Sequence, residues 1–237
     1  VYKRQIEYTF KNGQGDTNTC ASIANDFAGK SFDCVMAIAT PAAQAVAKLA
    51  TKTPVVFSAV TDPVGAQLTS SLSKPDKNIT GTSDEVQVDQ IIDKALEINP
   101  NTKTIGMLYN KGEANSVTNI KKAKAYCAKK NIKIEEATIA SVNEAQSAVN
   151  VLNSKCDAIF APNDNTVASA MNVVSDACKK ANKPLYVGAD SMVKDGGFLS
   201  VGIDYKELGK ETAKIVDKVL KGCLLYTSPS PRDPKTS

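Results

Sequence analysis

Short apolar runs alternate with longer helical segments along almost the whole chain, and this alternation limits the fold more than any other feature of the sequence. Runs such as 104–109 (TIGMLY) and 156–161 (CDAIFA) have the length of a buried strand. The segments between such runs are long enough for a crossover helix. Because strands that alternate with helices form parallel sheets covered on both faces, the sequence predicts an α/β protein.

The expected elements can be given by residue range. Strands are expected at 6–10, 34–39, 54–60, 104–109, 132–139, 156–161, 184–189 and 199–203. Helices are expected at 17–29, 41–50, 84–98, 114–130, 143–154, 165–181 and 205–221. The chain contains no apolar run long enough to indicate a membrane-spanning helix.

Three segments recur in the same order in the two halves of the chain. IEYTFKNGQGDTN matches IEEATIASVNEAQ, CVMAIATPAAQAVA matches CDAIFAPNDNTVASA, and PVVFSAVTD matches PLYVGAD. The sequence therefore predicts two similar lobes, each a parallel sheet flanked by helices. The spacing of the matches is not kept, so a loose likeness of any two α/β stretches stays an alternative. The second half opens with a strand and helix, 103–131, that has no counterpart in the first, so we expect the first βα unit of lobe 1 to be missing.

The repeat also gives the expected domain boundaries. Lobe 1 is predicted at 6–82, lobe 2 at 83–202, and a returning helix at 203–222 is expected to pack on lobe 1. The chain would pass between the lobes at a hinge formed by Gly81, Thr82, Gly202 and Asp204. A glycine at a strand end could equally mark a simple turn.

Both ends of the chain look foreign to this fold. Residues 1–5 (VYKRQ) and 223–237 (CLLYTSPSPRDPKTS) resemble translated sequencing-adapter sequence, and the second is a Pro/Ser-rich stretch that cannot form a core. A natural disordered tail is the alternative. An export signal at the natural start would be lost with an artefactual end.

Composition argues for binding rather than catalysis. The chain has no His, which removes the commonest general base and the commonest metal ligand, so we expect neither an enzyme nor a cofactor. The net charge of +4 comes mostly from the two ends, and aromatic residues make up only 5%, which is unlike a nucleic-acid binder. None of the six cysteines forms a C-x-x-C motif. Cys34 and Cys156 are expected in the core, and a disulfide among the others stays possible.

Two facing sheets would form a cleft between the carboxyl ends of their strands, so the loops at these ends are the candidate site. After strand 34–39, Thr40 is expected to cap a helix and Pro41 to open it, which would leave the N–H groups of Ala42 and Ala43 free for an anion. The polar run Asn163, Asp164, Asn165 and Thr166 follows strand 156–161 in the same way.

The second polar run is longer than one helix cap requires. We interpret Asp164 as a counter-charge for an ammonium group, with a capped helix that has surplus turn formers as the alternative. The turn after strand 104–109 adds Asn110, Glu113, Asn115 and Ser116 to the same rim. Glu113 taken alone could be a solvated loop charge.

Six segments in order carry a resemblance to a known family. AIATPAAQAV, PVVFSAVTDPVGAQL, NITGTSDEV, LYNKGEANSV, APNDNTVASA and LSVGIDYKELGKETAKIVDKVLKG are similar to segments of the substrate-binding proteins of ABC transporters whose better-known members bind aromatic amino acids. The resemblance covers residues 6–222. It implies the type I periplasmic-binding fold, with ligand-facing loops that hold Thr40, Pro41, Ala42, Ala43, Thr61, Asp62, Asn110, Asn115, Ser116, Asn163, Asp164, Asn165, Thr166, Ala189 and Asp190.

The resemblance further implies an extracytoplasmic, monomeric receptor, a lipoprotein in Gram-positive relatives, that delivers a small solute to a membrane permease and its ATPase. An α-amino acid fits best, with its carboxylate at 40–43 or 114–117 and its ammonium near Asp164 or Asp190. A sensor or regulator domain of the same fold is the first alternative. A Rossmann-type enzyme is the second, although no strand is followed by G-x-G-x-x-G and GIDYKELGK lacks the P-loop spacing.

Overall fold

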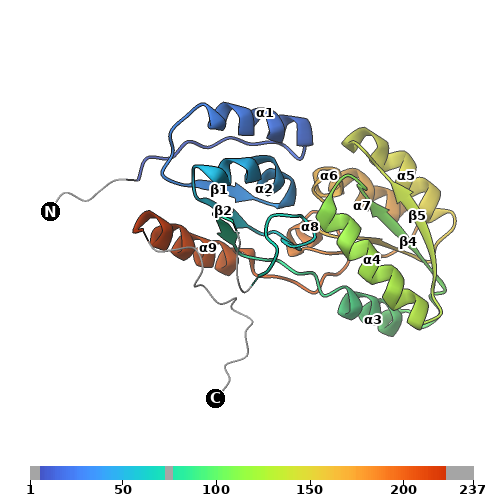
Figure 1. Ribbon diagram of the computed structural model, residues 1–237. Helices are drawn as coiled ribbons and strands as arrows, with labels where there is room; N and C mark the ends of the chain where they lie inside the picture. Colours follow the sequence, from blue (N-terminus) through green and yellow to red (C-terminus); the bar gives the residue numbers. More distant parts are fainter. Residues whose placement is uncertain (1–5, 73–76, 223–237) are drawn as a thin grey trace, which may run out of the picture.

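The chain forms two parallel sheets that lie side by side, each covered by helices (Figure 1). This computed structural model describes residues 6–72 and 77–222, so the predicted foreign ends at 1–5 and 223–237 lie outside the described residues. We call the first sheet with its helices the first lobe and the second sheet with its helices the second lobe. Their strands confirm the prediction of an α/β protein with parallel sheets.

The first sheet has the order β1-β2-β3, and all its strand pairs are parallel. Its strands are β1 (Val35–Ile38), β2 (Val55–Ser58) and β3 (Ile79–Gly81). The helices α1 (Thr17–Ala28) and α2 (Thr40–Val46) contact each other, and a 3-10 turn at Ala47–Thr51 extends α2. Helix α9 (Tyr205–Leu220) returns from the far end of the chain and contacts β2. Figure 1 shows α9 on the side of this sheet away from α1.

The second sheet has the order β5-β4-β6-β7 and is also parallel throughout. Its strands are β4 (Thr104–Tyr109), β5 (Lys133–Thr138), β6 (Ala158–Ala161) and β7 (Leu185–Val187). Its helices are α3 (Val88–Ile98), α4 (Ala114–Lys129), α5 (Ala145–Asn153), α6 (Asn165–Ser169), α7 (Met171–Lys180) and α8 (Asp190–Lys194), with a 3-10 turn at Val142–Glu144. One core lies between the sheet and α5 with α7, and another between the sheet and α3 with α4.

The strands follow from their sequences. All four residues of β6 are buried, as are the last five of β4, because helices cover both faces of the sheet. Helix α3 buries Val88, Ile91, Ile92 and Ala95, which lie on one face at helical spacing. The sequence periodicity therefore determines both the burial of the strands and the face that the helix turns to the sheet.

The lobes repeat the same local topology. Strand β1 pairs with β2 as β6 pairs with β7, in agreement with the sequence matches. In each lobe, the segment that leads to the other lobe lies beside the second strand of this pair. In the first lobe β3 pairs with β2, and in the second lobe Leu199 forms an isolated parallel bridge with Tyr186 of β7. The prediction of two similar α/β units is thus matched by this part of each sheet. The expected loss of a first βα unit stays a prediction.

Two predicted strands are wrong. Residues 6–10 form no strand, and Ile6, Tyr8 and Phe10 are exposed. Their sequence counterpart β5 is held by β4, whereas no described strand pairs with 6–10, and an unpaired extended segment gains no ladder of hydrogen bonds. The predicted strand 199–203 is reduced to the bridge at Leu199, because the chain then turns so that the N–H of Ile203 donates to Asp190 Oδ1 (3.2 Å).

Several predicted boundaries also differ. The helix expected at 165–181 is interrupted at Ala170, which separates α6 from α7. The helix expected from residue 84 begins at Val88, because Asp84 turns to a buried polar cluster described below. Strand β3 was not predicted, and of its residues only Gly81 was expected to have a role, as part of the hinge.

The cysteines are unpaired in the described part of the chain. Cys156 is buried, as expected for a core residue, whereas Cys34 is only partly buried. Cys20, Cys127 and Cys178 are free thiols as well, and Cys223 lies outside the described residues. No helix within 6–72 and 77–222 is long and apolar enough to cross a membrane.

The predicted hinge residues lie where the lobes are joined. Gly81 ends β3 so close to β2 that a Cβ atom would stand 1.9 Å from the carbonyl oxygen of Phe57, so only glycine fits there. Thr82 follows it and shares a hydrogen bond with Thr212 of α9 (2.8 Å), which also bonds to Ser58 of β2 (2.9 Å). These three buried hydroxyl groups fix α9 to the first sheet.

Replacing Thr212 by Val should therefore lower the stability of the protein. The change keeps the shape of the side chain but removes the hydroxyl group shared by Ser58 and Thr82, so we expect the free energy of unfolding to fall by about 1–2 kcal/mol. Urea unfolding followed by circular dichroism measures this. The control Thr17→Val, on the exposed first turn of α1, should change little, and an equal effect of the two substitutions would contradict the role of Thr212.

Candidate ligand-binding site

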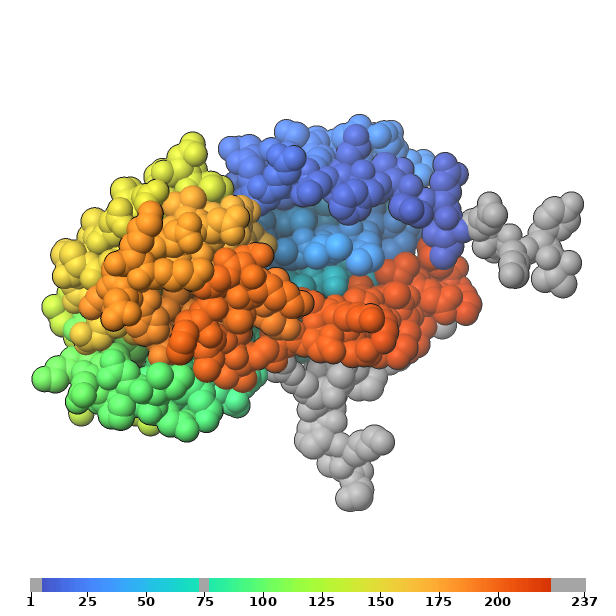
Figure 2. Space-filling view, turned by 180° about the vertical axis from the view of Figure 1, so that it is seen from behind, coloured from blue at the N-terminus to red at the C-terminus, as the bar shows by residue number. Residues whose placement is uncertain are grey.

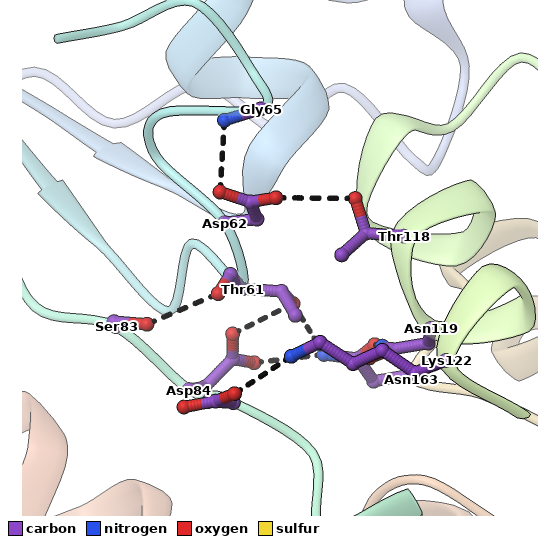
Figure 3. A network of polar contacts seen from close by, with 10 residues as sticks. Thr61, Asp62, Gly65, Ser83, Asp84, Thr118, Asn119, Lys122 and Asn163 are labelled. Carbon is purple, nitrogen blue, oxygen red and sulfur yellow. Dashed lines mark hydrogen bonds and ion pairs between the residues drawn. The ribbon is translucent and has the colours of Figure 1, made fainter. Parts of the chain in front are cut away.

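The loops at the carboxyl ends of the two sheets meet, and a side chain of the second lobe makes the central contact. Asn163, in the loop after β6, donates from Nδ2 to Thr61 Oγ1 (2.8 Å) and to Asp84 Oδ2 (3.0 Å). Thr61 follows β2 and Asp84 follows β3, so both acceptors belong to the first lobe or to the segment that leaves it (Figure 3). Figure 2 shows the two lobes in contact from the opposite side of the molecule.

Asp84 is the centre of this cluster, and the sequence analysis did not select it. Its carboxylate is 3% exposed and accepts hydrogen bonds from Thr61 Oγ1 (2.9 Å), Asn163 Nδ2 (3.0 Å) and the hydroxyl group of Tyr205 (3.0 Å). Burial raises the pKa of Asp84, and the three hydrogen-bond donors offset part of that rise. A signal was present, because Asp84 lies in the polar run Thr82–Ser83–Asp84 directly after Gly81.

Glu113 and Asp164 form a second acidic group at the start of α6. Glu113 is 1% exposed and accepts from the N–H groups of Asn165 and Thr166, both at 3.0 Å. The Asn165 amide (2.6 Å) and the Thr166 hydroxyl (2.9 Å) also donate to Glu113. The alternative of a solvated loop charge at Glu113 is therefore wrong. The Glu113 carboxylate thus already accepts hydrogen bonds from N–H groups at the start of α6 that were predicted to be free for an anion.

Asp164 is fully buried and holds three segments together. It caps α6 by accepting from the N–H of Val167 (2.8 Å), and it also accepts from the N–H of Asn110 (2.7 Å) and from Ser116 Oγ (2.6 Å). Burial, with a smaller contribution from the neighbouring Glu113 charge, raises the pKa of Asp164 to about 6. The side-chain amide of Asn110 donates to Thr166 Oγ1 (2.9 Å) and completes the link between the two loops.

The start of α2 differs from the expectation. Ala39, not Thr40, is the N-cap residue, and Thr40 and Pro41 open the helix. The N–H of Ala43 donates to the carbonyl oxygen of Ala39 (3.1 Å), so it is not free as predicted. Thr40 is buried, and its hydroxyl group has no hydrogen-bond partner among the described residues. Ala42, which directly precedes Ala43, is partly buried.

The backbone at this edge of the first lobe is strained. Ala39 has a φ of 72° at the end of β1, and Ala59 has a φ of 55° at the end of β2. Residues other than glycine rarely adopt this left-handed conformation, and such residues gather at functional sites. Ala39 lies directly before the candidate residue Thr40, and Ala59 lies two residues before Thr61.

The remaining predicted acids lie at the rim and are partly exposed. Asp62 Oδ1 accepts from the N–H of Gly65 (2.8 Å), while its Oδ2 accepts from Thr118 of α4 (3.3 Å). Asp190 opens α8 after the buried Ala189, and its Oδ1 accepts from Ile203. Of the hinge residues, Gly202 lies against the Asp190 carboxylate and Asp204 caps α9 through the N–H groups of Lys206 and Glu207.

Helix α4 contributes two buried asparagines, of which the sequence analysis selected only one. Asn115 donates to the carbonyl oxygen of Asn163 (2.9 Å), and Asn119 donates to Asn163 Oδ1 (2.8 Å). Both carbonyl oxygens of these side-chain amides are buried without a partner in the described part of the chain. Asn119 could have been found because it lies one helical turn after Asn115.

The described residues contain no group of three or more His, Cys, Asp or Glu side chains that could hold a metal ion. The structure instead brings together hydroxyl, amide and carboxylate groups from both lobes. These groups belong to Thr61, Asp84, Asn115, Asn119, Asn163 and Tyr205. Two parallel sheets in this arrangement, each flanked by helices, define the class of proteins with the type I periplasmic-binding fold.

Comparison with known proteins identifies the family. The family model for the ABC transporter substrate binding protein matches residues 2–229, and the chain belongs to this family. The match extends into both terminal segments that the sequence analysis set apart. The family is one of solute-binding proteins rather than of enzymes.

Three relatives are especially informative. A tyrosine-binding protein of Clostridioides difficile is 35% identical over 217 residues, which are 92% of this chain and 63% of that protein. The crystal structure of the ABC domain from Streptococcus pneumoniae in complex with L-Trp is 40% identical with a TM-score of 0.91, and the match covers 95% of this chain and 78% of that one. The ligand-free, open structure of a Clostridium difficile substrate-binding protein is 36% identical with a TM-score of 0.66, covering 97% and 78%. The overall structure is thus more similar to that of the L-Trp complex.

The raised pKa of Asp164 should make stability depend on pH. A carboxyl group whose pKa is higher in the folded than in the unfolded state binds its proton more tightly when folded, so its contribution to stability falls as pH rises from about 4 to about 6. We expect Asp164→Asn to flatten this part of the stability profile by about 1–3 kcal/mol. Asn keeps the preference for an N-cap position.

Urea unfolding at several pH values between 4.5 and 7.5 measures the effect. The control Asp176→Asn, on the exposed face of α7, should leave the profile unchanged. If the stability of the wild type falls with rising pH no more steeply than that of Asp164→Asn in this range, the pH dependence does not come from Asp164.

Proposed function

We propose that this protein is the extracytoplasmic receptor of an ABC importer and that it binds a small solute between its two lobes. The observation that carries the proposal is the contact of Asn163 with Thr61 and Asp84, which brings polar groups from both lobes to one place. Membership of the substrate-binding family supports the role in import. The expected partners are a membrane permease and its ATPase, and the receptor would act as a monomer, anchored as a lipoprotein or free in the periplasm.

The solute that fits best is an α-amino acid with an aromatic side chain. This is supported by the relative named for tyrosine binding and by the related structure that holds L-Trp. The chain spans only 63% of the tyrosine-binding protein's length. The ligand is therefore proposed from the residues of this chain as well as from its relatives. These residues offer carboxylates for an ammonium group and hydroxyl or N–H donors for a carboxylate.

The hydrogen bonds of the acids help to place the ammonium group. Asp164 already accepts from two backbone N–H groups and one hydroxyl group, and its role is to hold loops together. Asp190 is partly exposed and accepts one backbone hydrogen bond, which leaves acceptor capacity on its carboxylate. We therefore propose Asp190, together with Asp84, as the acidic region for the ammonium group, because both carboxylates lie near the hydroxyl group of Tyr205.

The carboxylate would then lie on the first lobe. The Thr40 hydroxyl group is buried and lacks a partner among the described residues, and a ligand oxygen would satisfy it. A zwitterion held in this way contacts both lobes only when they are close together. Binding would therefore shift an equilibrium between open and closed forms, without any chemical step.

Isothermal titration calorimetry against the twenty amino acids tests the proposal. We expect heat with L-tyrosine or L-tryptophan and much weaker binding of the matching deaminated acid, which lacks the ammonium group. Asp190→Asn should reduce affinity for the amino acid by about tenfold and leave affinity for the deaminated acid almost unchanged, because it removes only the charge pair. Asp195→Asn, an exposed acid just after α8, is the matched control.

The outcomes separate the parts of the proposal. Absence of heat with all twenty amino acids would exclude an amino-acid ligand. An equal loss of both ligands in Asp190→Asn would show that the residue does not contact the ammonium group. Uptake of the ligand by membranes that contain the cognate permease distinguishes a transport receptor from a regulator of the same fold.

A further inference from the structure

Helix α4 belongs to the second lobe, yet one of its faces lies against the first. Ala114 packs against the core of the first lobe, and Thr118, one turn later, donates to Asp62 Oδ2 in the loop after β2 (3.3 Å). Lys122, after a further turn, pairs with Glu85 in the segment that joins the lobes (2.6 Å). Residues four apart share a face of a helix, so these three form one stripe directed at the first lobe and the connection to it.

A second face of α4 contacts the side chain of Asn163, which reaches from the second lobe to the first. Asn119 donates to Asn163 Oδ1, which fixes the amide so that its Nδ2 points at Thr61 and Asp84 (Figure 3). Asn115 bonds to the backbone of the same residue. If Asn163 lost the contact with Asn119, its amide could turn away from the first lobe.

These contacts differ in their energetic weight. The Lys122–Glu85 pair has side chains that are 43% and 50% exposed, so water and salt screen it and it contributes little. Asn119 is fully buried, so its hydrogen bond to Asn163 is protected from competition with water. Thr118 is intermediate, because its partner Asp62 is partly exposed. Asn119 and Thr118 are therefore the residues to test.

We propose that α4 is a latch, in which Thr118 and Asn119 stabilise the closed arrangement of the lobes through contacts between protein groups alone. Thr118 acts through Asp62, and Asn119 acts through Asn163, so both are positioning residues rather than ligand contacts. The structure is more similar overall to the L-Trp complex, with a TM-score of 0.91, than to the ligand-free, open structure of the Clostridium difficile relative, with a TM-score of 0.66. We take the arrangement of its lobes to be the closed one on this ground.

A latch of this kind has a specific effect on binding. Apparent affinity is the intrinsic affinity multiplied by the fraction of protein in the binding-competent form. Weakening the latch lowers this fraction, and therefore lowers the affinity for every ligand by the same factor. A residue that contacts the ligand would instead change the affinities for two ligands by different factors. The affinity part of the inference rests on the proposed function, whereas the effect on lobe arrangement does not.

The test uses the full chain with the substitutions Thr118→Val and Asn119→Ala, and with Lys121→Ala on the exposed face of α4 as the control. Small-angle X-ray scattering without added ligand measures the radius of gyration, and calorimetry measures the dissociation constants of L-tyrosine and L-tryptophan. We expect each latch variant to have a larger radius of gyration and to bind both amino acids about two- to tenfold more weakly, by one common factor. Near-UV circular dichroism verifies that each variant is folded.

Several results would overturn the latch. One is a radius of gyration equal to that of the wild type in both latch variants. Another is an unchanged dissociation constant, or a change that differs between the two amino acids. If the wild type binds neither amino acid, the proposed ligand fails, and scattering alone then decides whether α4 holds the lobes together. Should Asn119→Ala not fold, Thr118→Val still gives both measurements.

Discussion

All strands within each sheet run in the same direction, and the rest of the molecule depends on this constraint. A parallel sheet places the carboxyl end of every strand, and hence every strand-to-helix loop, at one edge. Here the two edges face each other, so the loops after β2, β4 and β6 meet although they are far apart in the sequence. The polar residues at those loops could not hydrogen-bond to one another in antiparallel sheets of the same sequence segments.

The buried acids in this region have two different roles. Glu113 and Asp164 accept hydrogen bonds from N–H and O–H groups of α6 and of the turn after β4. They thereby provide acceptors for N–H groups that the start of α6 would otherwise leave unpaired. Asp84 accepts from the side chains of Thr61, Asn163 and Tyr205, which come from three distant segments. The first two acids thus stabilise the second lobe, whereas Asp84 links the lobes. A description by residue type alone would treat all three as equivalent.

The contacts between the lobes include the hydrogen bonds of Asn163 with Thr61 and Asp84 and the packing of Ala114 on the core of the first lobe. The buried hydroxyl groups of Ser58, Thr82 and Thr212 fix α9 to the first sheet, next to the segment that leads to the second lobe. The latch proposed on α4 would then set the balance between the two forms, and the solute would change it.

The sequence alone determined the class of fold and most of its helices and strands. Buried strands such as TIGMLY show continuous apolar runs, and α3 has its apolar residues at helical spacing, so local pattern was sufficient for these elements. The repeat pointed to the loop that holds Asn163 and Asp164, and the position after strand 104–109 pointed to Asn115 and Ser116. The structure places these four residues at one edge.

Only the tertiary structure decided which of these side chains contact each other and which residues join them. The strand predicted at 6–10 failed because a strand requires a partner, and a partner is not a property of the segment itself. Asp84 and Asn119 were missed because their local signals, a polar run after Gly81 and a place one turn after Asn115, do not show which distant groups folding brings within hydrogen-bond distance. Local periodicity reflects burial, whereas the pairing of buried polar groups depends on the arrangement of the two lobes in space.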